Sequence, residues 1–491
     1  MTRRAKIVCT IGPASSSSDV IRRLILSGMD VARLNFSHGT HEDHRALYTL
    51  IRSTAEDLGV NVAILMDLQG PKIRTGKMKD GQEAELRNGE TITITTRDVP
   101  GSAQCISTTY EHLPQDVKPG DTILIADGII ELNVRQVNPP DVLCEVVRGG
   151  MLGQHKGINL PGVHIAEPSM TEKDRRDLAF GLELGVDYAA LSFVRSPDDL
   201  RLMRDIIDAS GKQTRIVAKI ERPEALACFD DILALSDAIM VARGDLGVEM
   251  NFEDIPFVQK RLIQKCNACG IPVITATQML ESMTSHARPT RAEVTDVANA
   301  ILDGTDAVML SGETASGQFP VESCEVMVRI AAKAGEDMAG RSSLKRWEWL
   351  QSESVRQSVE KFNTPGFMES DAIGLAAAQM AESLHAKGIV CFTNSGFTAA
   401  AIARYRPKVP VIAFTRSDET CRRCALYWGV SAFKINRIID LNSLHEQVDE
   451  LLCENHLDHQ GGIMVITGGT PEGITGRTNF LKIHKIGEIV S

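Results

Sequence analysis

Short apolar runs alternate with segments of helical periodicity along most of the chain. Eight runs have the length and β-branched content of strands: residues 6–12, 31–37, 61–68, 188–194, 215–221, 238–247, 272–279 and 307–313. Because helical segments separate them, neighbouring strands are expected to run parallel. Eight parallel strands, each followed by a helix, are the number that closes a (β/α)8 barrel. The pattern therefore predicts a barrel as the central domain.

The alternation stops between residues 70 and 168. Turn-forming residues punctuate short apolar runs at 79–81, 87–89, 119–121, 126–128 and 138–140, and helical periodicity is absent. We expect a small β-barrel domain here, inserted into a larger barrel built from residues 1–69 and 169–340. Thr171 precedes an acidic first turn, which predicts the helix that returns the chain to the barrel.

A third unit is expected over residues 341–491. Helices are predicted at 371–386, 398–405, 419–428 and 443–455, and strands at 388–393, 409–415, 430–435 and 461–467. This alternation is typical of a separate, doubly wound α/β domain. The whole chain is thus expected to be α/β, with a TIM barrel, an inserted β domain and a C-terminal α/β domain.

Composition narrows the class of protein. Of 491 residues, 43% are hydrophobic and 24% charged, which is ordinary for a folded chain, and the formal net charge of −11 disfavours binding to nucleic acid. No apolar run approaches the ~20 residues of a membrane-spanning helix, and no secretory signal is recognisable at the N-terminus. The sequence therefore predicts a cytoplasmic protein without a membrane partner.

Cysteine usage agrees with a reducing compartment, because the 11 cysteines are scattered rather than arranged as a disulfide framework. Two C-x-x-C pairs occur, Cys266 with Cys269 and Cys421 with Cys424. Each pair lies in a helical pattern without clustered histidine partners, so we expect both to be structural.

Polar side chains collect where the predicted strands end. The segments concerned are 33–38, 67–74, 219–221, 242–247, 275–278 and 311–314. In a parallel barrel these ends meet on one face, which is where such folds place their active sites. One buried lysine or glutamate at a strand end is often a satisfied ion pair, but six such ends indicate a site.

The residue types favour a small phosphorylated carboxylic acid as the substrate. Glu221 and Asp245 form an oxygen-only pair suited to Mg²⁺, with Mn²⁺ as a substitute. Lys219 lies two residues before Glu221, on the same face of its strand, where it can stabilise a transferred phosphoryl group. Two arginines, Arg33 and Arg74, can hold phosphate in a bidentate manner. The segment Ala242, Arg243, Gly244, Asp245 resembles a turn whose amides can cradle a carboxylate.

Six blocks in order resemble the pyruvate kinase family, and the likeness covers nearly the whole chain. They are RLNFSHG (33–39), GINLPG (157–162), KIE (219–221), MVARGDLG (240–247), ATQMLES (276–282) and MLSGETA (309–315). The resemblance implies transfer of a phosphoryl group from phosphoenolpyruvate to ADP, giving pyruvate and ATP in the last step of glycolysis.

The resemblance also implies roles for individual residues. Lys219 would be the transition-state stabiliser, Thr277 part of a proton-delivery network, and Glu221 with Asp245 the metal ligands. The catalytic set would be Lys219, Thr277, Arg33 and Arg74, the substrate-binding set Arg33, Lys219, Ala242, Arg243, Gly244, Asp245 and Thr277, and the nucleotide-binding set Arg74, Lys156, Asn35 and His38. The inserted domain would be a lid, with Asp127 at a turn tip.

One departure from the family concerns potassium. Many members hold K⁺ with groups matching Asn35, Ser37, Asp67 and the backbone carbonyl of residue 68. In those members the segment after the aspartate reads Thr-Lys-Gly-Pro-Glu. Here the segment reads Leu68-Gln69-Gly70-Pro71-Lys72. A tethered ammonium at Lys72 can supply the positive charge that K⁺ would bring, so we expect no requirement for K⁺.

The resemblance further implies a homotetramer and an effector site in the C-terminal domain. Residues Thr393, Asn394, Ser395, Gly396 and Thr398 form a hydroxyl-rich loop that opens a helix, and Arg477 lies in the loop expected to face it. Because that second loop departs from the members best known for control by fructose-1,6-bisphosphate, we expect activation by a sugar monophosphate or AMP.

Two other readings are compatible with part of the pattern. A Mg²⁺-dependent barrel lyase acting on phosphoenolpyruvate or pyruvate would share the two carboxylates but lack the inserted domain and the arginine pair. A non-catalytic metabolite sensor would have lost Lys219 or a metal-binding carboxylate. Formation of ATP and pyruvate from phosphoenolpyruvate and ADP discriminates among the three.

Overall fold

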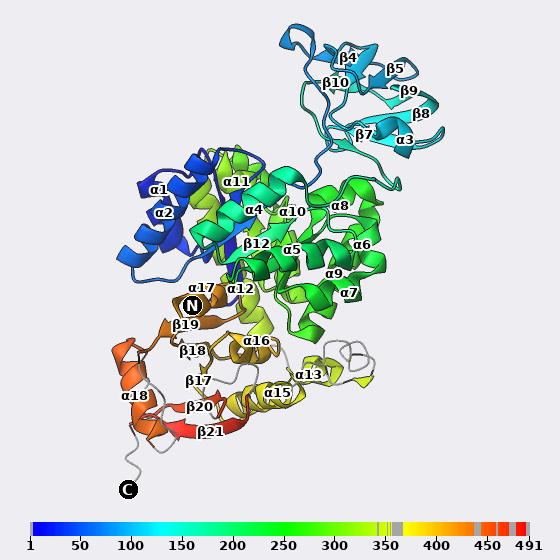
Figure 1. Cartoon of the computed structure of the whole chain (residues 1–491). Coiled ribbons are helices and arrows are strands. Elements are labelled where there is room, and N and C mark those ends of the chain that lie inside the picture. The colour runs from blue at the N-terminus through cyan, green and yellow to red at the C-terminus, as the bar shows by residue number, and fades with distance from the viewer. Residues whose placement is uncertain are drawn as a thin grey trace.

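The structure, a computed structural model, describes residues 3–340, 343–350, 352–353, 355, 367–436, 443–457, 460–470 and 478–487. Three parts follow one another along the long axis of the molecule (Figure 1). The inserted β domain stands above the barrel, and the C-terminal domain lies beneath it.

The predicted eight-stranded barrel is confirmed. Its strands are β1 (Lys6–Ile11), β2 (Val31–Asn35), β3 (Ala63–Asp67), β12 (Tyr188–Leu191), β13 (Arg215–Ile220), β14 (Ala238–Ala242), β15 (Val273–Ala276) and β16 (Ala307–Leu310). They are all parallel and close in the order β1-β16-β15-β14-β13-β12-β3-β2. Each strand is shorter than the apolar run that predicted it, because the last residues of each run leave the sheet and form the loop that follows.

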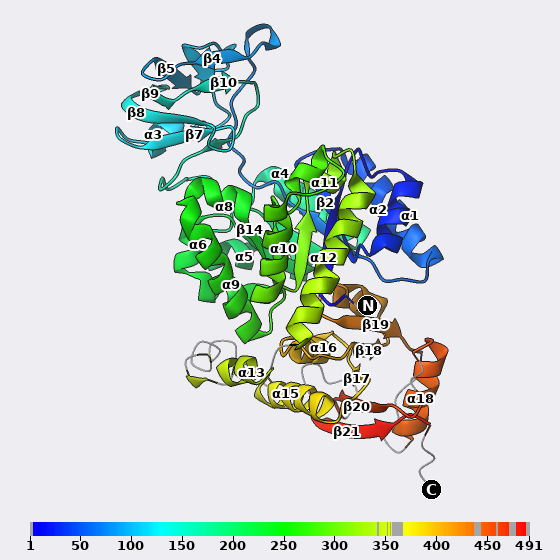
Figure 2. The same cartoon turned by 180° about the vertical axis from the view of Figure 1, so that it is seen from behind.

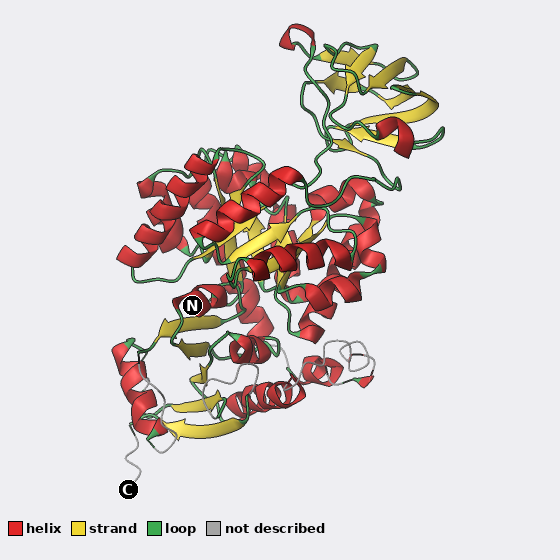
Figure 3. Cartoon of the chain, viewed as in Figure 1, coloured by secondary structure: helices red, strands yellow, loops and turns green. Residues whose placement is uncertain are grey.

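Helices surround this barrel (Figure 3). They are α1 (Ser18–Ser27), α2 (His41–Asp57), α4 (Glu172–Leu184), α5 (Pro197–Ala209), α6 (Pro223–Ala227), α7 (Phe229–Leu235), α8 (Arg243–Glu249), α9 (Ile255–Cys269), α10 (Arg291–Asp303), α11 (Gly312–Ala315) and α12 (Pro320–Gly340), with 3-10 turns η2 (Phe252–Asp254) and η3 (Glu281–Thr284). Thr171 caps α4 as predicted, in a capping box with Asp174. No helix among the described residues is long and apolar enough to cross a membrane.

The inserted domain has an apolar core of its own. It contains η1 (Lys79–Gly81), β4 (Ala84–Leu86), β5 (Thr91–Thr95), β6 (Cys105–Ser107), α3 (Leu113–Asp116), β7 (Thr122–Ile125), β8 (Ile130–Asn138), β9 (Asp141–Arg148), β10 (Gly150–Leu152) and β11 (Ile158–Asn159). The strands form a six-stranded sheet with edges β11 and β6, and a separate two-stranded sheet, rather than one closed ring. The two chain segments that connect this domain to the barrel are hydrogen-bonded to each other. The Ile158 amide donates to the Ile73 carbonyl at 2.9 Å, and the Thr75 amide donates to the Lys156 carbonyl at 2.8 Å.

The C-terminal domain is the predicted α/β unit with one additional strand. After α13 (Leu344–Leu350) come α15 (Phe367–Ser383), β17 (Gly388–Phe392), α16 (Phe397–Ala403), β18 (Val411–Thr415), α17 (Asp418–Cys424), β19 (Val430–Lys434), α18 (Leu444–Glu454), β20 (Ile463–Gly468) and β21 (Phe480–Lys485). The sheet order is β19-β18-β17-β20-β21, and β21 is antiparallel to β20. The sequence did not reveal β21, because an edge strand with alternating polar residues lacks a buried apolar run.

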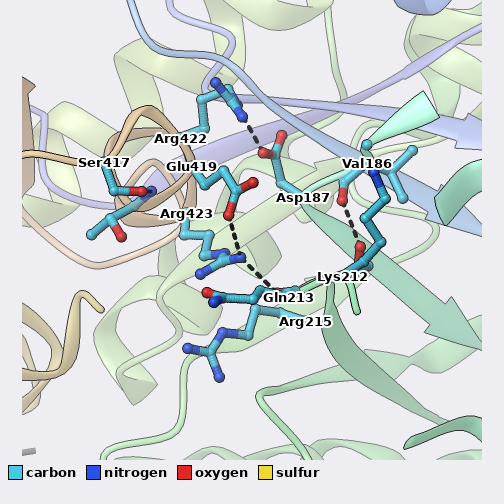
Figure 4. Close-up of polar contacts among 12 residues, drawn as sticks. Val186, Asp187, Lys212, Gln213, Arg215, Ser417, Glu419, Arg422 and Arg423 are labelled. Carbon is cyan, nitrogen blue, oxygen red and sulfur yellow. Dashed lines mark hydrogen bonds and ion pairs between the residues drawn. The ribbon is translucent and has the colours of Figure 1, made fainter. Parts of the chain in front are cut away.

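The C-terminal domain packs against the amino ends of the barrel strands (Figures 2 and 4). The carboxylate of Asp187, just before β12, receives the guanidinium of Arg422 on α17 at 2.8 Å and that of Arg52 on α2 at 2.6 Å. Next to it, Arg423 donates to the Gln213 carbonyl at 2.6 Å. Cys421 and Cys424 on α17, like Cys266 and Cys269 on α9, are buried free thiols in helices, as a structural role requires.

Candidate active site

Four charged side chains meet at the carboxyl ends of β2, β3 and β13, on the face that carries the inserted domain (Figure 1). The Lys219 ammonium lies 2.9 Å from Glu221 Oε1 and 3.2 Å from Asp67 Oδ1. Asp67 Oδ2 accepts the Nε–H of Arg33 at 2.7 Å. Cations and carboxylates therefore alternate in one buried row, in which each charge is fixed by its neighbours.

Burial and charge set the protonation states in this row. Burial lowers the pKa of Lys219, but the negative charges of Asp67 and Glu221 outweigh it, so the net pKa lies above its ordinary value. Burial raises the pKa of Asp67, and the positive charges of Lys219 and Arg33 reverse this to a net decrease. Lys219 is thus a fixed positive charge at neutral pH, held where solvent scarcely screens it.

Glu221 and Asp245 together fit a divalent cation. The pKa of Glu221 is raised by burial and, despite the opposing effect of Lys219, by the negative charge of Asp245. Two carboxylates that repel each other in a buried setting are stabilised by a cation between them. Among the residues that the structure describes there is no cluster of three or more metal-binding side chains, so water or substrate would have to complete a hard-cation site at these two oxygen donors.

A second part of the site joins α8 to the end of β15. The predicted turn over residues 242–245 is instead the start of α8, because β14 ends at Ala242 and the chain coils at once. The Gly244 amide donates to the Thr277 hydroxyl at 2.7 Å. A Cβ at Gly244 would lie 3.4 Å from that hydroxyl oxygen, an ordinary van der Waals distance, so this contact alone does not require glycine.

Arg243 lies differently from a substrate-binding side chain. Its guanidinium pairs with Asp296 on α10 at 2.7 Å and donates to the Thr277 carbonyl at 2.8 Å. Its side chain therefore binds the protein, and of this residue the backbone alone is left for the expected cradle.

The residues expected to bind nucleotide come from two places: Arg74 and Lys156 lie at the base of the inserted domain, and Asn35 and His38 lie at the end of β2. Arg74 and Gly157 form a bridge between the two connecting segments, and the Arg74 guanidinium donates to the His155 carbonyl at 3.0 Å, next to Lys156. The pKa of His38, on the loop after β2, is lowered by burial and by the cations Arg74, Lys72, Arg33 and Lys173. Positive charge therefore gathers around the loop that carries His38, and such an arrangement favours a polyanionic ligand.

Of the residues expected to form the monovalent-cation pocket, Asn35 lies opposite Asp67 in the register of β2 and β3. Asn35 Oδ1 accepts the Ser37 amide at 3.1 Å, and the Leu68 carbonyl accepts the Ser192 hydroxyl at 2.7 Å. Asp67 is committed to Arg33 and Lys219. Lys72 is exposed, and its ammonium makes no ion pair with the described part of the chain.

Asp127 and the expected effector loop lie at opposite ends of the molecule. Asp127 is exposed in the turn between β7 and β8, with a φ of 55°. In the C-terminal domain, the Thr393 hydroxyl accepts the Gly396 amide at 3.0 Å and the Thr398 hydroxyl bonds Thr478 at 2.9 Å, while Asn394 is exposed and Ser395 half-buried. Arg477 lies outside the described residues.

Sequence reasoning missed Ser192 and Phe193. The Lys219 ammonium donates to the Ser192 hydroxyl at 2.6 Å, and the Phe193 amide donates to Glu221 Oε2 at 2.7 Å. Both follow β12, which like β1 contributed nothing to the expected site. The signal was available, because the same strand-end rule applied to this strand would have found them.

Known proteins resemble this chain over its whole length. Residues 2–324 match the pyruvate kinase barrel domain, and residues 371–484 match the pyruvate kinase alpha/beta domain. Pyruvate kinases of Corynebacterium glutamicum and Mycobacterium tuberculosis are 46% and 43% identical over 488 residues, covering 99% of this chain and 98% and 99% of theirs. A crystal structure of a pyruvate kinase from Cryptosporidium parvum is 39% identical with a TM-score of 0.89, covering 99% of this chain and 96% of that one. With its barrel, its α/β domain and its strand-end charges in the arrangement described above, the chain belongs to the pyruvate kinase family.

Proposed function

We propose that the row Arg33, Asp67, Lys219, Glu221 is where the phosphoryl group of phosphoenolpyruvate passes to ADP, giving pyruvate and ATP. The observation that carries this is the Lys219 ammonium, buried, positively charged and held within 3.2 Å of two carboxylates. A fixed cation in a weakly screened site stabilises the negative charge of the transferring phosphoryl group and of the enolate that remains.

Glu221 and Asp245 would hold Mg²⁺, which Mn²⁺ can replace. When bound, the ion supplies positive charge that offsets that of the phosphate and carboxylate oxygens. Arg33 would orient the phosphoryl group with its remaining guanidinium N–H. The substrate carboxylate would bind at the start of α8, at Ala242, Gly244 and Asp245. The Thr277 hydroxyl would take part in delivering a proton to the methylene carbon through water. Asn35, His38, Arg74 and Lys156 would hold the phosphates of the nucleotide.

The inserted domain would close over the nucleotide and exclude water. Its turn at Asp127 and Gly128 already approaches α8, where a Cβ at Gly128 would lie 3.9 Å from Val248, and Asn159 donates to Glu249 at 3.0 Å. We expect small-angle scattering to show compaction when both substrates bind, and an unchanged profile would contradict the closure.

The reaction is tested by measuring ATP and pyruvate formed from phosphoenolpyruvate and ADP by the purified chain. We expect activity with Mg²⁺ or Mn²⁺, its loss on addition of EDTA, and its return on adding the metal back. A folded protein that is inactive under all these conditions would contradict the proposal. Lyase products from phosphoenolpyruvate in the absence of ADP would favour the alternative barrel reaction instead.

Regulation and assembly form a second part of the proposal. The loop 393–398, with Asn394 exposed, would take the phosphate of a sugar monophosphate or of AMP together with Arg477, and the chain would act as a homotetramer. Titration of both classes at subsaturating phosphoenolpyruvate tests the first, and the mass from light scattering tests the second. A curve that no effector shifts, or the mass of a monomer, would refute the corresponding part.

A further inference from the structure

Two consecutive residues of the site have left-handed backbone. Thr277 has a φ of 70° and Gln278 a φ of 53°, directly after β15. A positive φ is an outlier for a β-branched residue, and such conformations persist only where surrounding contacts impose them. Something in the structure must therefore hold this turn.

Arg243 is the side chain that holds it. One end of its guanidinium, Nη1, is anchored on Asp296 of α10, at 2.7 Å from Oδ2, and the other, Nη2, donates to the Thr277 carbonyl at 2.8 Å. The Arg243 side chain is 10% exposed, whereas its anchor Asp296 is 40% exposed, so the contact with the Thr277 carbonyl is the better shielded of the two. The adjacent residue, Gly244, donates its amide to the Thr277 hydroxyl at 2.7 Å. Neighbouring residues of α8 thus bind the carbonyl and the hydroxyl of the same threonine.

These contacts orient the hydroxyl. Thr277 Oγ1 donates its hydrogen to the Ala276 carbonyl at 2.5 Å and accepts from Gly244, so its remaining lone pair has a defined direction. Were the turn to relax toward ordinary negative φ, the hydroxyl would leave the Gly244 amide. Displacement of a positioned group by about 1 Å can lower a rate on the order of 10²-fold.

We propose that Arg243 is a positioning residue of the reaction, which clamps the left-handed turn at Thr277 and Gln278 and thereby fixes the Thr277 hydroxyl against Gly244. The inference rests on the proposed role of Thr277. Lysine cannot replace this arginine, because a single ammonium does not offer the two separated donor edges that reach Asp296 and the Thr277 carbonyl at once.

A double-mutant cycle tests the proposal on the full-length enzyme with saturating Mg²⁺. R243Q, T277V and the double variant are compared for kcat and for the KM of phosphoenolpyruvate and of ADP. We expect R243Q to lower kcat by about 10²-fold, with the KM of ADP within about threefold of the parent. R243K should restore little. The double variant should be no slower than T277V, because the clamp acts through that hydroxyl.

R204Q is the matched control, since it removes a guanidinium that binds Asp237 at 2.6 Å at the other end of the barrel, and its kcat should stay within twofold of the parent. D296N keeps the arginine but weakens its anchor, and should give a partial loss of kcat with a native circular-dichroism spectrum. If D296N and R243K, folded, both keep the parental kcat, the clamp is refuted.

The outcomes separate this inference from the function on which it rests. A slow T277V with a fast R243Q overturns the clamp alone. Losses that multiply in the double variant also overturn it, because they show Arg243 acting independently of the hydroxyl. A T277V with parental kcat overturns both the role of Thr277 and the clamp, while phosphoryl transfer by the parent enzyme still stands.

Discussion

The two ends of the barrel each bury an aspartate between two cations, and they use it differently. At the amino end Asp187 receives Arg422 (Figure 4). It also receives Arg52 and the Ile64 amide, and these contacts join α2, α17 and β3. At the carboxyl end Asp67 receives Arg33 and Lys219, but Lys219 is shared with Glu221.

The difference lies in what remains for a ligand. Both carboxylate oxygens of Asp187 accept donors from the chain across a domain junction, so the joint is complete without a ligand. At the carboxyl end, neither Asp245 nor Lys72 has a side-chain ion pair with the described residues, and the backbone at Thr277 is held in a disfavoured conformation. We therefore expect a structural role for the saturated ion pairs around Asp187 and a catalytic role where charged side chains are left without a partner in the described part of the chain.

The largest effect is expected at the catalytic end. K219M should lower kcat by about 10²–10³-fold or more, because an apolar side chain of similar length replaces the fixed positive charge. The coupled assay for pyruvate measures this. K260M, which removes an exposed lysine paired with Asp303 on the outside of the barrel, is the control. A K219M enzyme within threefold of the parent would exclude Lys219 as the stabiliser.

The second prediction concerns Lys72 at the carboxyl end of the barrel, whose ammonium, unpaired among the described residues, we expect to replace a bound K⁺. The parent enzyme should change less than about twofold in rate when Na⁺ or a bulky organic cation replaces K⁺, since the ammonium is tethered. K72E should lower activity about tenfold and create activation by K⁺, with the additional replacement of Leu68 and Gln69 by Thr and Lys strengthening it. Strong activation of the parent by K⁺ would show the opposite.

At the saturated end, the same kind of substitution should affect stability and not rate. D187N leaves Arg52 and Arg422 without their shared carboxylate, and we expect about 3 kcal/mol lower free energy of unfolding. Denaturant titration measures it, and kcat of the folded enzyme at saturating substrate should stay within twofold. R201Q, which breaks an exposed pair with Asp198, should be neutral in both measurements. A large fall in kcat for D187N would mean that the two ends do not differ as described.

The smallest effect concerns acid. Burial lowers the pKa of His44, whose ring stacks on Phe36 and bonds the His38 carbonyl at 2.9 Å, while its Nδ1 is buried without a partner among the described residues. A histidine with a lowered pKa supports the fold above its ordinary pKa of 6.5 and loses that support as pH falls through the lower, folded-state value.

The parent should therefore lose more thermal stability between about pH 7.5 and about pH 5.5 than H44Q, whose amide does not titrate. The midpoint of thermal unfolding at the two pH values measures this difference. His112, the N-cap residue of α3 in the inserted domain, supplies the matched control. H112Q should show the same loss of thermal stability between the two pH values as the parent. Equal acid sensitivity of the parent and H44Q would remove His44 as the cause.

The order of strands and the residue types at their ends were determined by the sequence. Apolar runs separated by helical segments specify eight parallel strands, and parallel strands in a barrel bring 33–38, 219–221 and 242–247 to one face whatever the details of packing. Lys219, Glu221 and Asp67 could thus be placed together from the chain alone.

Which atoms bind one another was decided only by the tertiary structure. Ser192 reaches Lys219 across neighbouring strands, and Arg243 turns from the expected cradle to Asp296 and Thr277, contacts that depend on strand register and helix packing. The additional strand β21 likewise exists because β20 offers it an edge. Periodicity is a local property and survives in the sequence, whereas side-chain partners and backbone strain arise from segments far apart in the chain, so they appear only when the fold brings those segments together.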